Sequence, residues 1–86
     1  MNLLTLKILN FEQGIYSGKV KELNLMAIDG WLKILPGHAP YINALKPGSQ
    51  IDFIDENGVN RSLEATEGFV KVEMGGTVYL FVQTKI

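Results

Sequence analysis

Residues 29–48 read D-G-W-L-K-I-L-P-G-H-A-P-Y-I-N-A-L-K-P-G, and this stretch carries the strongest structural signals in the sequence. Pro36 and Pro40 lack backbone donors and fix φ at both ends of a three-residue segment, which predicts a stiff loop instead of a sheet ladder. Pro47 and Gly48 predict a second tight turn. Short apolar segments lie before, between and after these breaks. The stretch therefore predicts short strands joined by turns.

Alternation of apolar and polar residues dominates the rest of the chain. Leu4, Leu6 and Ile8 are separated by polar residues, a pattern that predicts a half-buried strand. The alternation slips between Val20 and Leu23, and a β-bulge near residues 18–22 would explain the slip. Residues 55–58, D-E-N-G, predict a hairpin turn of type I′, in which both central residues have positive φ.

Turn signals recur along the whole sequence. Further turns are predicted over residues 10–14, 27–30 and 74–77. No segment shows a sustained helical pattern. We therefore predict an all-β fold, a flattened two-sheet sandwich or barrel of roughly eight to ten short antiparallel strands. We expect a single domain over residues 1–86, because 86 residues build one small core and not two.

Composition argues against several functional classes. The formal net charge is −1 with mixed signs along the chain, so we expect no nucleic-acid partner. There is no cysteine and one histidine, which excludes a disulfide framework and a histidine-rich metal site, and we expect no cofactor. We expect neither insertion into a membrane nor a secretory signal. No nucleophile–base pair or phosphate-binding glycine loop is present, so we expect no enzymatic activity.

A partner is the remaining source of additional stability for so small a core. A stiff loop on a β-scaffold is a usual docking surface, because little conformational entropy is lost when it binds. Trp31 follows a predicted Asp-Gly turn, where a tryptophan either anchors an interface or packs into the core.

The sequence I-L-P-G-H-A-P at residues 34–40, followed by L-K-P-G at 45–48, resembles the N-terminal β-sandwich of the epsilon subunit of F-type, proton-translocating ATP synthases. The resemblance covers essentially the whole chain. Its further matches are Gly30, Y-S-G at residues 16–18 with Val20, D-E-N-G at 55–58 and G-F-V-K-V at 68–72. The departures are N-F-E at residues 10–12, Trp31, Lys33 and E-G at 67–68, where the family usually has other residues.

The C-terminus is the largest departure from that family. Most members carry two helices after the sandwich, and those helices inhibit ATP hydrolysis in some members and bind ATP in others. This sequence ends at Ile86 without an interrupted helical pattern, and we expect a naturally short subunit in preference to a fragment. We therefore expect no nucleotide binding.

The resemblance implies a non-catalytic subunit of the central stalk, or rotor, that couples proton-driven rotation to ATP synthesis. Its implied partners are the gamma subunit and the c-subunit ring, on the cytoplasmic face of a bacterial inner membrane. Ring contacts are implied for Ala27, Ile28, Asp29, Gly30, Trp31, Gly37 and His38. Gamma contacts are implied for Asn10, His38, Tyr41, Ile42 and Asn43. The residues expected to shape the loops are Pro36, Gly37, Pro40, Pro47 and Gly48.

Several interpretations remain open from sequence. His38 is either a loop residue hydrogen-bonded to backbone or a contact residue. Tyr79 and Phe81 share one face of the last strand, which is either buried on both faces or in contact with the gamma subunit. The acidic residues Asp52, Asp55 and Glu56 are expected at a solvated hairpin tip. The alternative function is an unrelated β-sandwich that binds a peptide or a small ligand.

Overall fold

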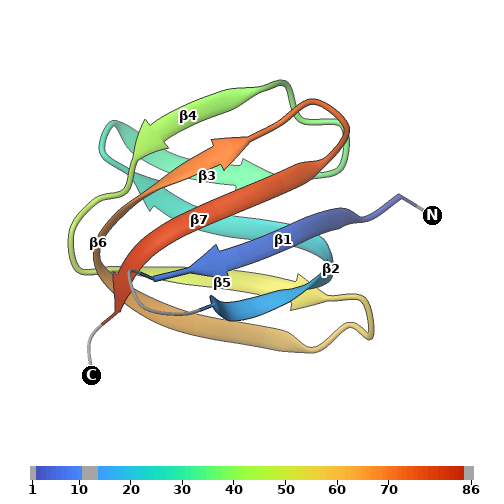
Figure 1. The fold of residues 1–86 in the computed structure, drawn as a ribbon, viewed down its shortest axis with the longest axis horizontal. Helices are drawn as coiled ribbons and strands as arrows, with labels where there is room; N and C mark the ends of the chain where they lie inside the picture. The colour runs from blue at the N-terminus through green and yellow to red at the C-terminus, as the bar shows by residue number, and fades with distance from the viewer. Residues whose placement is uncertain (1, 11–13, 85–86) are drawn as a thin grey trace.

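The computed structural model of the protein describes residues 2–10 and 14–84. These residues contain no helix, and so none long and apolar enough to cross a membrane. Figure 1 shows the seven strands: β1 (Leu4–Leu9), β2 (Gly14–Ala27), β3 (Gly30–Ile34), β4 (Tyr41–Ala44), β5 (Ser49–Asp55), β6 (Asn60–Val72) and β7 (Thr77–Thr84). The all-β prediction is confirmed. The turn predicted over residues 10–14 lies mostly outside the described residues.

The described strands are fewer than the eight to ten expected because two of them are long and bent. β2 has 14 residues and β6 has 13. The register of β2 against β5 shifts between Val20 and Glu22, which confirms the predicted bulge. A similar shift between Ala65 and Glu67 interrupts the pairing of β6 with β7. A bulge increases the local twist of a strand, so each long strand bends without ending.

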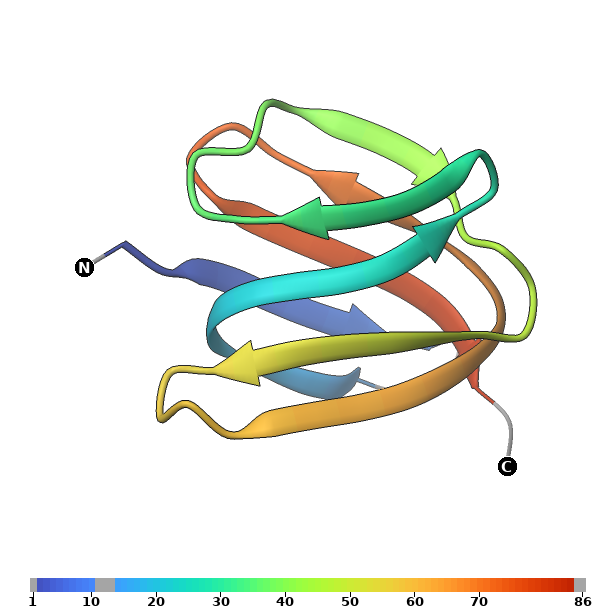
Figure 2. The same ribbon diagram turned by 180° about the vertical axis from the view of Figure 1, so that it is seen from behind.

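The pairings arrange the strands in two layers (Figures 1 and 2). One layer contains β3, the second half of β2, β5 and the first half of β6. The other contains the first half of β2, β1, β7, the second half of β6 and β4. β1 and β7 pair in parallel, which corrects the expectation of a purely antiparallel sandwich. Alternation has the same period in both orientations, so it cannot distinguish them.

The hydrophobic core lies between the two layers. Leu4, Leu6 and Ile8 of β1 are buried, as the alternation predicted. The ring of Tyr16 packs at one side of this core, 4.8 Å from the ring of Phe53. The other buried apolar residues are Val20, Leu23, Leu25, Ala27, Ile34, Leu45, Ile51, Ala65, Val70, Val72, Val78, Leu80 and Val82.

The hairpin between β5 and β6 differs from the expected type. Gly58 has a φ of 83°, and no described non-glycine residue has positive φ, so the type I′ assignment is wrong. The Gly58 N–H donates to the Asp55 carbonyl, and the Asp55 N–H donates to the Val59 carbonyl. These bonds describe a type I turn that is followed by a glycine in the left-handed region.

The Asp55 side chain explains this turn and corrects a second expectation. Its carboxylate accepts hydrogen bonds from the N–H groups of Asn57 and Val59 and from Nε of Arg61, at 2.9–3.0 Å. Asp55 is buried and is therefore not part of a solvated tip, whereas Glu56 is exposed. The hydrogen bond from Val59, followed by that from Arg61, holds the pKa of Asp55 below its ordinary value.

The loops gather at two ends of the sandwich (Figure 2). We call one the Asp29 end: it contains the turn at residues 28–29 and the Pro47–Gly48 turn, where the Ser49 N–H donates to the Lys46 carbonyl. We call the other the His38 end: it contains residues 35–40 and the loop at 73–76, where the Glu73 N–H donates to the Thr77 carbonyl. The turns predicted at residues 27–30, 47–48 and 74–77 are confirmed.

Candidate docking site

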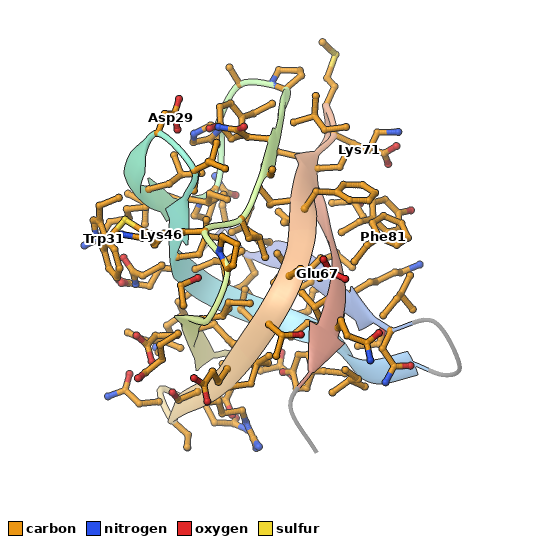
Figure 3. The ribbon with its side chains drawn as sticks, turned by 90° about the vertical axis from the view of Figure 1, so that its left-hand side faces the viewer. Asp29, Trp31, Lys46, Glu67, Lys71 and Phe81 are labelled. Atoms are coloured by element: carbon orange, nitrogen blue, oxygen red, sulfur yellow. The ribbon has the colours of Figure 1, made fainter. Side chains whose placement is uncertain are left out.

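The residues implied as ring contacts lie at both ends of the molecule. Ile28, in the turn at the Asp29 end, is 63% exposed. Trp31, in the adjoining β3 (Figure 3), is 59% exposed, so the alternative of a core position for Trp31 is wrong. Ala27 is buried in the core and offers no side chain to a partner. Gly37 and His38 lie beyond the far end of β3, a strand about 16 Å long at the usual rise per residue. The fold therefore does not bring the two parts of this set together.

The residues implied as gamma contacts are distributed along β4 and near its ends. Tyr41 and Asn43 pair with the buried residues Val72 and Val70 and face inward. Ile42, between them, faces solvent. The remaining two members, Asn10 and His38, lie near the Asp29 end and at the His38 end, respectively.

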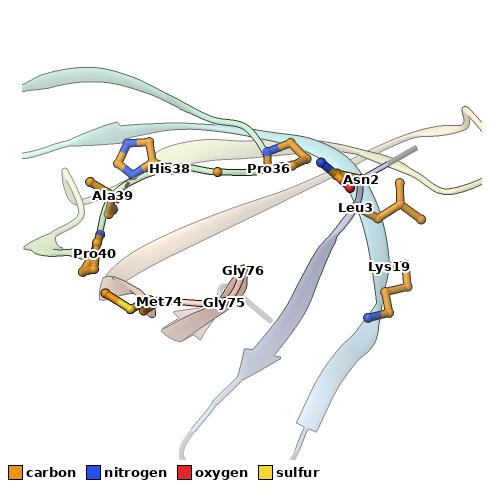
Figure 4. A pocket seen from close by; sticks show the side chains of 11 residues that line it. Asn2, Leu3, Lys19, Pro36, His38, Ala39, Pro40, Met74, Gly75 and Gly76 are labelled. Carbon is orange, nitrogen blue, oxygen red and sulfur yellow. Dashed lines mark hydrogen bonds between the residues drawn. The ribbon is translucent and has the colours of Figure 1, made fainter.

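The His38 end contains a wide cleft of about 610 Å³ (Figure 4). Pro36, His38 and Pro40 form one wall, with Lys19 and Met74 among the residues around it. His38 Nδ1 lies 2.7 Å from the Ala39 carbonyl oxygen, so it donates to backbone, as one of the two interpretations of this residue predicted. Its ring also contacts Tyr41 edge-on, at 5.9 Å between centroids.

The outer surface of β4, β6, β7 and β1 carries a cluster of aromatic rings. Phe69 pairs with Phe81 in register and their rings stack at 4.9 Å. The Tyr79 ring lies 6.1 Å from that of Phe81. Phe69 and Phe81 are 41% and 36% exposed, so the expectation that β7 is buried on both faces is wrong. We call this surface the aromatic face.

Lysine side chains border the aromatic face. Lys71 pairs with Tyr79 on one side, and Lys7 pairs with Tyr79 on the other. Lys7 Nζ lies 5.8 Å from the centre of the Tyr79 ring, within reach of a cation–π contact. Lys71 also lies 3.5 Å from Glu73. The face thus combines apolar rings with positive charge at its border.

The outer surface of the other layer has a different character. Asn24, Lys33, Asp52 and Ser62 lie in one row across β2, β3, β5 and β6. Gln50 donates to Asp52 and to Ser62, at 2.8 Å in each case. A surface of mutually hydrogen-bonded polar groups is stable in water. Trp31 shares this outward face with Lys33, but the groups beyond it are polar, and this contrast makes the aromatic face the better candidate for the larger interface.

An apolar groove of about 470 Å³ continues the aromatic face to the Asp29 end. Asn10 and Ile28 meet in this groove, although the resemblance implied different partners for them. The groove is lined by Leu9, Asn10, Ile28, Ala44, Leu45, Pro47, Glu67, Gly68, Phe69, Phe81, Val82 and Gln83.

Trp31 and the aromatic face point in different directions. Figure 3 shows Trp31 and Phe81 on opposite sides of the molecule, with Asp29 at the tip of the turn above them. A body that is rigid between two such surfaces is able to hold two partners in a fixed relation. Among residues 2–10 and 14–84, no group of three or more His, Cys, Asp or Glu side chains is placed to hold a metal ion.

Sequence reasoning did not identify Phe69 or the groove. Alternation places Tyr79 and Phe81 on one face, but Phe69 is far from them in the sequence. Only the register of β6 against β7 shows that the three rings form one cluster. The sequence signal for Phe69 is alternation: Phe69 and Lys71 alternate with Val70 and Val72, which are buried, so Phe69 and Lys71 face outward.

The fold and this surface define a small two-layer β-sandwich with an exposed aromatic face and a projecting hairpin turn. The family model described as "ATP synthase, Delta/Epsilon chain, beta-sandwich domain" matches residues 3–83. The chain therefore belongs to this family. This membership contradicts the alternative of an unrelated β-sandwich.

Solved structures support the fold assignment. One similar chain comes from the Euglena gracilis mitochondrial ATP synthase, in a structure of its OSCP/F1/c-ring, with a TM-score of 0.86 and 21% identity. Another comes from the central stalk and c-ring of the Tetrahymena thermophila mitochondrial ATP synthase, with a TM-score of 0.75 and 15% identity. Each alignment covers 93% of the present chain. The chain matches 50% of the Euglena chain and 63% of the Tetrahymena chain, so it spans only part of their lengths.

Proposed function

We propose that this chain is the β-sandwich of a central-stalk subunit that joins the gamma subunit to the c-subunit ring and performs no chemistry itself. Rotation of the ring would reach the catalytic head through this rigid link. Family membership supports the assignment to an ATP synthase. Both structural neighbours are mitochondrial. A location on the cytoplasmic face of a bacterial inner membrane therefore stays a prediction from sequence.

The observation that carries the proposal is the uncovered stack of Phe69 on Phe81 beside the apolar groove. Large aromatic side chains are enriched at the centres of protein interfaces, and charged groups are usual at their rims. Lys7 and Lys71 have the rim position here. We assign the aromatic face and the groove, apart from Ile28, to the gamma subunit on these grounds.

The exposed hairpin turn supports the second contact. Trp31 faces outward from β3 on the side of the molecule opposite Phe81 (Figure 3), and Ile28 is exposed in the adjoining turn, next to the apolar groove. A tryptophan at a protruding, exposed position is a usual interface anchor. We assign these two residues to the ring. Gly37 and His38 lie at the opposite end of the molecule. We therefore do not assign them to the surface of the ring that Ile28 and Trp31 contact.

The test is size-exclusion chromatography of the chain mixed with the gamma subunit from the same source. We expect a stoichiometric complex that the Phe81→Ala variant forms less completely. Met74→Ala is the matched control, because Met74 is an exposed apolar residue of the cleft at the His38 end and is not part of the aromatic stack. Equal complex formation by both variants would remove the aromatic face from the proposal. No complex at tens of micromolar with the unmodified chain would contradict direct binding to gamma.

A further inference from the structure

Asn43 is a polar residue at an inward-facing position. It pairs with Val70 of β6, whose side chain is fully buried, whereas its neighbour Ile42 faces solvent. A polar group placed towards a core destabilises the fold unless its atoms are hydrogen-bonded. The hydrogen bonds of Asn43 therefore determine what this residue contributes.

The side-chain amide of Asn43 is hydrogen-bonded through both of its polar atoms. Nδ2 donates to Asp29 Oδ1 at 3.0 Å and to Tyr41 Oη at 2.8 Å. Oδ1 accepts from the Ala44 N–H at 2.8 Å. Asn43 thus connects β4 directly to the turn between β2 and β3.

This connection spans the open side of the sandwich. Among the described strands, β3 pairs only with β2, and β4 pairs only with β6, so no ladder joins β3 to β4. Two backbone bonds fasten the base of the turn to the end of β4: Ile28 N–H to Ala44 O, and Lys46 N–H to Met26 O, both at 2.9 Å. The bond from Asn43 to Asp29 reaches beyond them, to the tip of the turn.

We propose that Asn43 is a positioning residue whose amide holds the tip of the Asp29 turn against β4. The turn carries Ile28 and leads directly into Trp31, so the same bond sets the direction in which both side chains are presented. Ile28 also lines the apolar groove. The purpose of this positioning, contact with the ring, rests on the proposed function, whereas the conformational role does not.

The test measures hydrogen exchange of the Ile28 amide in the full chain by NMR. N43D leaves an oxygen to accept from the Ala44 N–H but places a second carboxylate opposite Asp29. D29A removes the acceptor at an exposed turn position, where it does not threaten folding. We expect either variant to accelerate Ile28 exchange about tenfold, the effect of losing one charge-assisted hydrogen bond.

N24D is the matched control. The Asn24 amide donates to Glu22 at 2.8 Å on the polar outer face, so the substitution creates the same type of carboxylate pair away from the turn. We expect it to change Ile28 exchange by less than about twofold. The exchanged pair D29N/N43D restores a donor at position 29 and an acceptor at position 43, and we expect it to return Ile28 exchange close to that of the unmodified chain.

Unchanged exchange of the Ile28 amide in both N43D and D29A would overturn the positioning role. The role would also be overturned if Ile28 exchanged as fast in D29N/N43D as in the single variants. Binding to the purified c-ring is then compared for N43D and N24D, with weaker binding expected for N43D alone. Accelerated exchange with unchanged ring binding would support the positioning role and contradict the ring contact. The two proposals therefore fail in distinguishable ways.

Discussion

Phe69 of β6 and Phe81 of β7 face each other across the strand pair, with ring centroids 4.9 Å apart and an angle of 23° between the ring planes. Their neighbours along each strand, such as Val70 and Leu80, are fully buried on the other side. The same two strands therefore contribute to the core with one face and present an aromatic stack with the other. This two-sided use is the basis of the first prediction.

Phe81→Ala should weaken binding to the gamma subunit by about 2 kcal/mol, or roughly thirtyfold in Kd, the loss typical of a residue at the centre of an interface. The change should also remove the stacking energy with Phe69, about 0.5–1.5 kcal/mol of stability. Isothermal titration calorimetry measures the binding, and urea unfolding measures the stability. An equal loss of affinity in Met74→Ala would contradict the assignment of the face.

Trp31→Ala should leave the free energy of unfolding within about 0.5 kcal/mol of the unmodified chain, because the side chain is mostly exposed. It should weaken attachment to the c-ring through loss of an interface anchor. Thermal unfolding tests the first expectation and co-purification with the ring tests the second. Normal coupling in purified complexes that carry this substitution would count against the ring contact.

Asp55→Asn should make the stability of the domain less dependent on acid pH. The Val59 N–H and Arg61 hold the folded-state pKa of Asp55 below 3.8, its value without these partners. The stability that the ionised Asp55 contributes to the folded state is therefore fully present above pH 3.8, and it is lost as the pH falls through the folded-state pKa. We expect a lower urea midpoint for the variant at pH 7, and a difference that closes under strongly acidic conditions.

Glu56→Gln is the control for that series, because Glu56 is exposed on the same hairpin. It should leave the urea midpoint at pH 7 unchanged. A constant difference between Asp55→Asn and the unmodified chain across the acid range would show that the charge of Asp55 is not responsible.

Gly68→Ala should destabilise the domain by about 2–3 kcal/mol, because the new methyl group would overlap backbone atoms. A Cβ at this position would collide with the Phe81 carbonyl oxygen and lie 2.9 Å from Val82 Cα. Backbone atoms of a paired strand do not move aside as the end of a flexible side chain does. Urea unfolding of the purified variant measures the effect.

Gly14→Ala is the matched substitution. A Cβ there would lie 3.8 Å from Leu9 Cδ2, an ordinary van der Waals contact. We expect no destabilisation, and a gain of up to about 0.5 kcal/mol from reduced freedom of the unfolded chain. Equal effects of the two substitutions would show that the close approach of β6 to β7 at Gly68 is not rigid.

The local features of the fold were predictable from particular residues. Leu4, Leu6 and Ile8 alternate with polar neighbours, which places them in the core whatever strand lies beside them. Pro36, Pro40 and Pro47 exclude regular pairing wherever they occur. The D-E-N-G hairpin was located correctly, but its type was not, because the Asp55 carboxylate stabilises a different turn.

The sequence by itself therefore determined which segments extend, where they turn and which side chains face inward, since these properties depend on residues a few positions apart. The tertiary structure alone decided that β1 lies parallel to β7, that Phe69 stacks on Phe81 and that Asn43 binds Asp29. It also separated Gly37 and His38 from Ile28 and Trp31 at opposite ends of β3. These relationships depend on register and on contacts between segments distant in the chain, which alternation leaves undetermined.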